Sequence, residues 1–152
     1  MHEYLLWLPL AAYAVHVLEE AVLNWKCWAA SSLKLTNVNW AIFDVANLAV
    51  MFITIATAMV GWQLPAFALM ITALMLINGI FFHILPTLTQ GKFSPGVITA
   101  SVLFVPLSFW IYWAAYNDNV LSIGTFVLSL ILGGLLMAAP ILFLKLRDKL
   151  AA

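Results

Sequence analysis

The stretch LLWLPLAAYAVHVLEE, residues 5–20, is the first long apolar run of the chain. Near its end stand His16, Glu19 and Glu20, spaced so that on a helix one imidazole and two carboxylates share a face. Ionisable side chains inside a membrane helix are costly and generally mark a functional site. The run therefore predicts a membrane helix that carries part of a site.

The composition of the whole chain also indicates a membrane protein. Of its 152 residues, 66% are hydrophobic and 8% are charged, whereas a soluble domain carries about 25% charged residues. Six basic and six acidic side chains cancel, so no polybasic surface suggests nucleic acid as a partner. The sole cysteine, Cys27, excludes an internal disulfide and a cysteine-based metal cage. The N-terminus lacks the basic start of a signal peptide, so we expect the first run to be retained.

Five apolar runs are long enough to cross a bilayer, which takes about 20 residues. We place them at 5–25, 38–61, 65–89, 95–116 and 120–145. The predicted fold is all-α: a single transmembrane domain, residues 1–152, built as an integral membrane bundle of five transmembrane helices. Pro86, Pro106 and Pro140 lie inside the last three runs. Because proline lacks an amide donor, we expect kinks there.

The connections between the runs predict an orientation. All six Lys and Arg side chains lie on one side, in residues 26–37, residues 90–95 and the tail 145–149, whereas Glu3 and Asp118 lie on the other. By the positive-inside rule, the N-terminus is outside and the C-terminus is cytoplasmic. We therefore expect a multi-pass protein of a cytoplasmic (inner) membrane.

Three of the runs bring polar side chains to one depth. At a rise of 1.5 Å per residue, these side chains lie about 6 to 18 Å from the cytoplasmic ends of their helices. They are His16 and Glu20 on the first run, Asp44 and Asn47 on the second, and Asn78 and His83 on the third. This coincidence predicts a pocket in the cytoplasmic half of the bundle, with Tyr13 and either Thr99 or Ser101 at its edge. Asn78 lies about 140° around an ideal helix from His83, so we expect it to line a neighbouring part of that pocket.

The carboxylates of this layer need compensation. Glu19, Glu20 and Asp44 have no Lys or Arg at their depth, and three uncompensated charges would repel one another. Either the carboxyls are protonated, or His16 and His83 carry protons, or a metal cation lies among them. Two imidazoles with two or three carboxylates suit zinc or non-haem iron. We predict a divalent metal held by His16, His83 and Glu20, with Glu19 as a further ligand or general base and Asp44 as a ligand or its partner.

Three segments resemble a known family. They are HVLEE at 16–20, NGIFFH at 78–83 and KFSPGV at 92–97, and together they are similar to the HXXEE family of small bacterial multi-pass proteins of unknown function. The resemblance implies that His16, Glu19, Glu20, Asn78 and His83 are site residues. A looser likeness of architecture links the chain to emopamil-binding-protein-like five-helix proteins, which use intramembrane His and Glu as acid and base on hydrophobic substrates.

These observations predict a metal-dependent membrane enzyme, a hydrolase, oxidoreductase or isomerase, that acts on a lipid-like or small hydrophobic substrate. Asn47, Asn78, Tyr13 and Ser101 would contact the substrate or orient the ligands. Membrane lipid is an expected partner, and homo-oligomerisation stays open.

Other functions remain open at this point. Without a metal, a protonated Glu19 or Glu20 would donate a proton to an alkene while His16 or Asp44 removes another, as in an isomerase or cyclase. A proton-coupled transporter would use the carboxylates as a relay, although the chain lacks an inverted repeat. A lipid-binding protein would use the same side chains as a structural hydrogen-bond cluster between helices.

Overall fold

The computed structural model describes residues 1–35 and 38–150, apart from the side chains of residues 144–150. Within these residues all regular structure is helical, and five helical spans are long and apolar enough to cross a membrane. The spans are Glu3–Val22, Trp40–Gln63, Pro65–Gln90, Val97–Asn117 and Ile123–Phe143. The predicted all-α fold with five membrane-length helices is confirmed, and the predicted runs match these spans to within a few residues. The side chains of the basic tail, 145–149, which entered the orientation prediction, lie outside the described residues.

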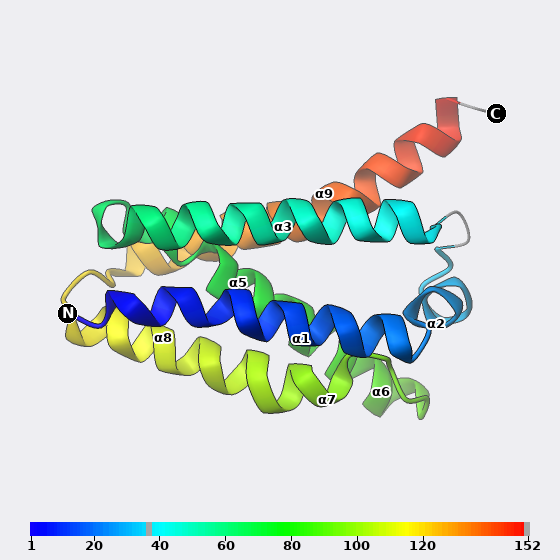
Figure 1. Ribbon diagram of the computed structural model, residues 1–152, viewed down its shortest axis with the longest axis horizontal. Coiled ribbons are helices and arrows are strands. Elements are labelled where there is room, and N and C mark those ends of the chain that lie inside the picture. Colours follow the sequence, from blue (N-terminus) through cyan, green and yellow to red (C-terminus); the bar gives the residue numbers. More distant parts are fainter. Residues whose placement is uncertain (36–37, 151–152) are drawn as a thin grey trace.

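Several spans are divided into shorter elements, labelled in Figure 1. In chain order these are η1 (Glu3–Trp7), α1 (Leu8–Val22), α2 (Trp25–Ser32), α3 (Trp40–Val60), η2 (Gly61–Gln63), α4 (Pro65–Ala68), α5 (Met70–Ile77), η3 (Asn78–Ile84), α6 (Leu85–Gln90), α7 (Val97–Thr99), η4 (Ala100–Phe104), α8 (Val105–Asn117) and α9 (Ile123–Leu150).

The outer surface of the bundle is apolar. Large side chains on the membrane-length spans point outward and are 62–71% exposed; examples are Phe52, Met59, Val102, Phe109 and Leu135. Monomeric soluble proteins rarely expose contiguous apolar surface on this scale. The five apolar helices and this surface indicate a multi-pass membrane protein.

The connection between the first two spans contains a helix that the sequence analysis treated as a loop. Asn24 adopts a left-handed conformation, with φ of 58°, and separates α1 from α2. In Figure 1, α2 is seen nearly end-on, so it lies across the long axis at one end of the bundle. Trp28 of α2 is buried, so burial of this side chain against the bundle stabilises the short helix.

Two of the prolines follow wide, π-helical turns. Segment η3 ends just before Pro86 and segment η4 ends just before Pro106. Because proline cannot donate to the carbonyl four residues earlier, and its ring crowds that carbonyl, the preceding turn widens to hydrogen bonds that span five residues. The two π turns pack against each other. Pro140 lies inside α9, which continues through it.

Helix α5 is the centre of the bundle, because it packs against α1, α3, α8 and α9. Its contact with α9 is close at Gly133. A Cβ atom there would lie 2.7 Å from the backbone nitrogen of Leu74 and 2.8 Å from the carbonyl oxygen of Met70. Only a glycine allows the two backbones to approach this closely. Helix α9 thus packs closely against α5, and α3 packs against α1.

Asp118 links three chain segments by hydrogen bonds at the end of the bundle opposite α2. The side chain is 5% exposed, and its carboxylate accepts hydrogen bonds from the backbone amide and the Nδ1 of His2 and, at 2.9 Å, from the indole nitrogen of Trp62. Glu3 accepts a hydrogen bond of 2.6 Å from the backbone amide of Trp62. The amide of His2, followed by the hydrogen bonds from Trp62 and the His2 ring, lowers the pKa of Asp118 to about 2.

Candidate functional site

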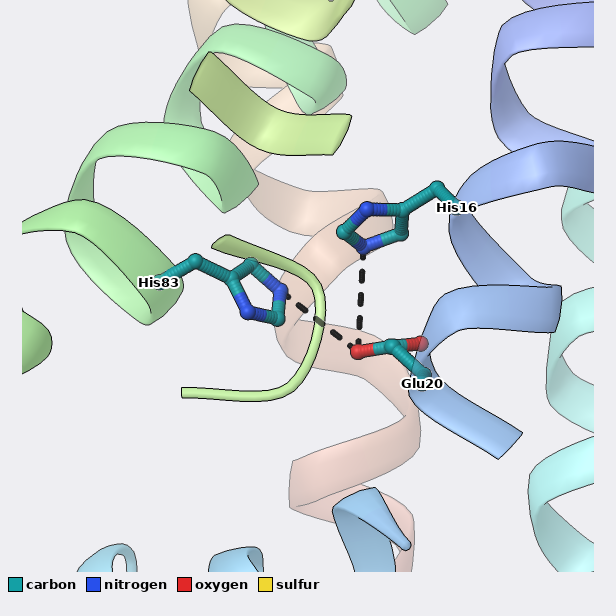
Figure 2. Close-up of side chains that lie close together, drawn as sticks. All are labelled: His16, Glu20 and His83. Carbon is teal, nitrogen blue, oxygen red and sulfur yellow. Dashed lines mark ion pairs between the residues drawn. The ribbon is translucent and has the colours of Figure 1, made fainter. Parts of the chain in front are cut away.

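Two histidines and one glutamate converge in the half of the bundle near α2. His16 and Glu20 come from α1, and His83 comes from η3 (Figure 2). The Nε2 atoms of His16 and His83 lie 3.7 and 3.5 Å from the same oxygen, Glu20 Oε1. The three ligand-type atoms lie within 4.8 Å of one another. All three side chains are at most 7% exposed, and we call them the His–Glu centre.

The second nitrogen of His16 is held by Thr99. His16 Nδ1 lies 2.8 Å from Thr99 Oγ1, and that hydroxyl donates to Glu19 Oε2 at 2.6 Å. A hydroxyl has one hydrogen, so Thr99 accepts from the Nδ1–H of His16. In the neutral imidazole, Nε2 of His16 is then the unprotonated nitrogen, with its lone pair toward Glu20, and it has no hydrogen-bond partner among the described residues.

His83 is held in the same way by Ser94. His83 Nδ1 lies 3.1 Å from Ser94 Oγ, whose hydroxyl faces the carbonyl oxygen of Pro95 at 3.5 Å. If the serine hydrogen is directed to that carbonyl, which only accepts, the serine oxygen accepts from His83 Nδ1–H. With both imidazoles neutral and in these tautomers, the His–Glu centre presents two nitrogen lone pairs and one carboxylate oxygen.

The two glutamates of the motif have different positions. Glu19 accepts hydrogen bonds from the backbone amides of Gly96, Ile98 and Thr99, at 3.0, 3.2 and 2.8 Å. These amides lie at the start of the fourth span, where a helix leaves its amides without internal partners and a carboxylate is favoured. Glu19 therefore holds the 96–99 turn against α1, and Glu20 alone faces the histidines.

Aromatic rings and one glycine pack tightly around the centre. Gly96 has φ of 98°, and a Cβ atom there would lie 2.7 Å from His83 Cε1 and 2.8 Å from His16 Cε1. A side chain at this position would displace both imidazoles. The ring of Phe104 lies 4.3 Å from that of His16, and the ring of Trp28 stacks 6.5 Å from that of His83. The histidine rings are thereby fixed in orientation.

The π turns explain why these residues meet. In a π turn, residues five apart are linked by hydrogen bonds and lie on one face, whereas on an ideal α-helix they lie about 140° apart. Segment η3 thus brings Asn78 to the face of His83, and η4 brings Phe104 to the face of Thr99. Asn78 lines the cavity next to the centre, which is the neighbouring part of the pocket in which we expected it.

Three further predicted residues lie beside the centre. Tyr13, Asn47 and Asn78 line a cavity of about 110 Å³ that His16 and Glu20 also line. The hydroxyl of Tyr13 donates to Asn47 Oδ1 at 2.8 Å. The structure therefore brings together helices 1 to 3 of the predicted pocket.

Two predicted residues lie elsewhere. Asp44 is exposed and does not line the cavity. Its neighbour Phe43 does line the cavity, and the next residue along a helix points about 100° away. Ser101 is also exposed; of the two alternatives on the fourth span, Thr99 is the one that contacts the centre.

Three residues at the centre were not assigned a role by the sequence analysis. They are Trp28, Ser94 and Gly96. The segment KFSPGV was noted, and its Ser-Pro-Gly sequence was the signal for a tight turn.

The fold and the centre define a class of protein: an all-helical protein with five membrane-length helices and a buried His–Glu centre near one end. The chain belongs to the family described as "Protein of unknown function with HXXEE motif", whose sequence model matches residues 7–111. The resemblance noted from the motif is thus confirmed, and the matched range contains all three residues of the His–Glu centre.

One curated relative adds to the comparison. The chain is 29% identical over 79 residues to the uncharacterised protein YrkK of Bacillus subtilis (strain 168). The alignment covers 51% of this chain and 49% of that protein, so the chain spans about half the length of the relative. No solved structure matches the chain.

Proposed function

We propose that the chain is a membrane enzyme whose His–Glu centre binds one divalent metal ion, zinc or non-haem iron, and acts on a hydrophobic substrate. The observation that carries the proposal is the convergence of two Nε2 lone pairs on Glu20 Oε1, with both Nδ1–H groups turned away to hydroxyls. Three acceptors facing one point repel one another unless a cation or a proton lies between them. Histidine ligands of metals typically donate their other N–H to such an outer partner.

The distances fit one ion. Bonds of about 2.0–2.1 Å place two ligand atoms about 3.3 Å apart at a tetrahedral angle and at most about 4.2 Å apart. The separations of 3.5 and 3.7 Å from Glu20 fall in this range. The outer bound of 4.8 Å for the whole set exceeds the tetrahedral separation by about 1.5 Å, so the ligand atoms that lie farthest apart would have to approach each other by up to that distance on metal binding. Two histidines with one carboxylate form a known ligand set for catalytic zinc and for non-haem iron, and three protein ligands leave a position for substrate.

A divalent ion at this place would supply a Lewis acid beside an apolar cavity. The chain's own residues do the rest. Glu20 and the two imidazoles hold the ion, and Thr99 and Ser94 keep both Nε2 atoms unprotonated. The cavity that reaches the centre has mainly apolar walls, which favour a lipid-like or small hydrophobic substrate.

Elemental analysis of the purified protein tests the metal. We expect about one zinc or iron per chain in the wild type, and loss of the metal in His16→Ala and His83→Ala, because each removes one of three ligands. His2→Ala is the matched control, since His2 lies at the opposite end of the bundle beside Asp118. A wild-type protein that holds no stoichiometric metal, even after anaerobic reloading with Zn²⁺ or Fe²⁺, would end this proposal.

The proposal includes an orientation in the bacterial inner membrane, with the N-terminus outside, the C-terminus cytoplasmic and the centre in the cytoplasmic half. Its support is the position of Lys26, Lys34 and Lys92 near the α2 end. Cys27 in α2 is exposed and is the sole cysteine. In intact cells we expect a membrane-impermeant maleimide to leave Cys27 unlabelled and to label a Cys27→Ser/Asn119→Cys variant. The reverse pattern would invert the orientation.

A second candidate is a metal-free isomerase or cyclase. It is favoured by the position of Glu20 Oε1 between two imidazole nitrogens, since a protonated Glu20 could donate a proton while a histidine accepts another. One proton on Glu20 would, however, satisfy a single nitrogen and leave the other buried without a partner, which is costly. Activity that survives chelators would favour this candidate over the metal enzyme.

A further inference from the structure

The cavity beside the His–Glu centre extends away from it between α3 and α9. Asn47 and Val50 of α3 form one wall, and Leu136, Met137 and Ile141 of α9 form the other. Both helices contact α4 and α5, and α3 packs in addition against α1 and η1. In Figure 1 the C-terminal part of α9 diverges from the rest of the bundle. Asn47, Leu136, Met137 and Ile141 are half-buried although they line the cavity, and we infer from this that the cavity opens sideways, between α3 and α9.

The size of the cavity limits what it holds. Its volume is about 110 Å³, whereas an engineered apolar cavity that accepts a single benzene measures about 150 Å³. A fused-ring sterol or a lipid with two chains would not fit without moving a helix. A single alkyl chain fits, because its width is small and its far end passes out through the lateral opening.

Outside the His–Glu centre, one polar side chain on the cavity wall has unused hydrogen-bonding capacity. Tyr13 and Asn47 are paired with each other, and the amide nitrogen of Asn47 donates to the carbonyl of Phe43 at 2.9 Å. Asn78 differs, because within the described part of the chain its buried Oδ1 has no partner and its amide nitrogen bonds to Met137 Sδ alone, at 3.6 Å. A buried carbonyl oxygen without a donor is unfavourable, so Asn78 is suited to accept a hydrogen bond from a ligand. Because η3 places Asn78 on the face of His83, that ligand group would lie next to the His–Glu centre.

We propose that the cavity binds a single-chain lipid with a hydrogen-bond-donating head, such as a long-chain alcohol, which reaches it from the bilayer between α3 and α9. The hydroxyl is held by Asn78 beside the His–Glu centre, and the chain lies along the apolar walls. This inference rests on the proposed function, since it names the substrate class of the same centre.

The test uses a dodecanol that carries a photoreactive diazirine on its chain, added to the purified full chain in detergent. After irradiation, mass spectrometry locates the labelled residues. We expect labelling on the cavity faces of α3 and α9, and we expect an excess of plain dodecanol to suppress it. The same excess of dodecane, which lacks the hydroxyl, or of cholesterol, which is too wide, should suppress it much less. This comparison needs no variant, so it does not depend on how a mutant folds.

Two matched pairs of variants sharpen the result. Ala46→Phe fills the cavity and should abolish the suppressible labelling, whereas Leu48→Phe, on the 53% exposed outer face of α3, should leave it unchanged. Asn78→Leu should weaken competition by dodecanol about two- to tenfold, the value of one hydrogen bond, and leave competition by dodecane unchanged.

Equal suppression by dodecanol, dodecane and cholesterol in the wild type would overturn the inference, and so would equal labelling of the Ala46→Phe and Leu48→Phe variants. The outcome is separable from that of the proposed metal centre. Chain binding should persist in protein treated with a chelator, and metal content is measured independently of it. Stoichiometric metal with no selective binding of the alcohol would remove this inference and leave the metal centre standing.

Discussion

Replacing Thr99 with valine removes a single oxygen atom that connects two residues of the HXXEE motif. That oxygen accepts from His16 Nδ1 at 2.8 Å and donates to Glu19 at 2.6 Å. Valine has nearly the same shape, so the buried position stays filled, and Glu19 keeps its three backbone amide donors. The imidazole of His16 then loses the group that keeps its Nε2 unprotonated. Loss of such an outer partner costs about 10- to 100-fold in metal affinity, which is about 1.4–2.7 kcal/mol.

The assay is competition for Zn²⁺ between the purified protein and a chromophoric chelator, with thermal unfolding measured on the same samples. Thr99→Ser is the matched control, because it keeps the hydroxyl and should retain wild-type affinity to within about threefold, far less than the loss expected for a missing partner. If Thr99→Val binds Zn²⁺ as tightly as the wild type and unfolds at the same temperature, the reasoning that Thr99 sets the state of His16 is refuted.

Four other substitutions test the remaining contacts. Gly96→Ala would force a methyl group against both imidazoles at a φ of 98° and should destabilise the fold by about 1–3 kcal/mol, with loss of metal; a wild-type melting temperature would contradict this. Glu20→Gln should lose the metal and keep the fold, whereas Glu19→Gln, which turns an amide group toward backbone N–H donors, should lower the melting temperature and retain most of the metal; elemental analysis and thermal melts would expose the opposite pattern. The hydrogen bonds that lower the pKa of Asp118 to about 2 favour its ionised form in the folded state, so its contribution to stability is full above the ordinary aspartate pKa of about 3.9 and declines as pH falls toward 2. The melting temperature of Asp118→Asn should therefore approach that of the wild type over this interval, and a constant difference from pH 6 to pH 2 would show that Asp118 does not titrate there.

The five helices and the three residues of the His–Glu centre could be predicted from the sequence, because both depend on composition along the chain. Membrane-length apolar runs are read directly from hydropathy. Ionisable side chains are so rare in these runs that His16, Glu20 and His83 stood out, and the helical rise placed them at a common depth.

The direction in which each side chain faces could not be predicted in the same way. Asp44 has a suitable depth but lies on the outside of α3, because rotation of a helix about its axis is set by packing against its neighbours. Glu19 and Glu20 are adjacent, and only the position of the 96–99 turn decides which of them faces the histidines. That turn is distant in sequence from the motif, so its contact with Glu19 is a property of the tertiary structure.

The π turn η3 has a consequence for how this centre tolerates insertions and deletions. A π turn amounts to one extra residue accommodated within an α-helix. Deleting a residue between Gly79 and Phe82 would restore regular α-helical hydrogen bonds and yield a locally more regular helix. His83 would then follow Asn78 by four residues of regular α-helix instead of five residues of π turn, and both spacings leave the two side chains on one face. In a regular helix the same one-residue change would rotate His83 by about 100°, so the wide turn lets this segment differ in length by one residue while His83 still faces Glu20.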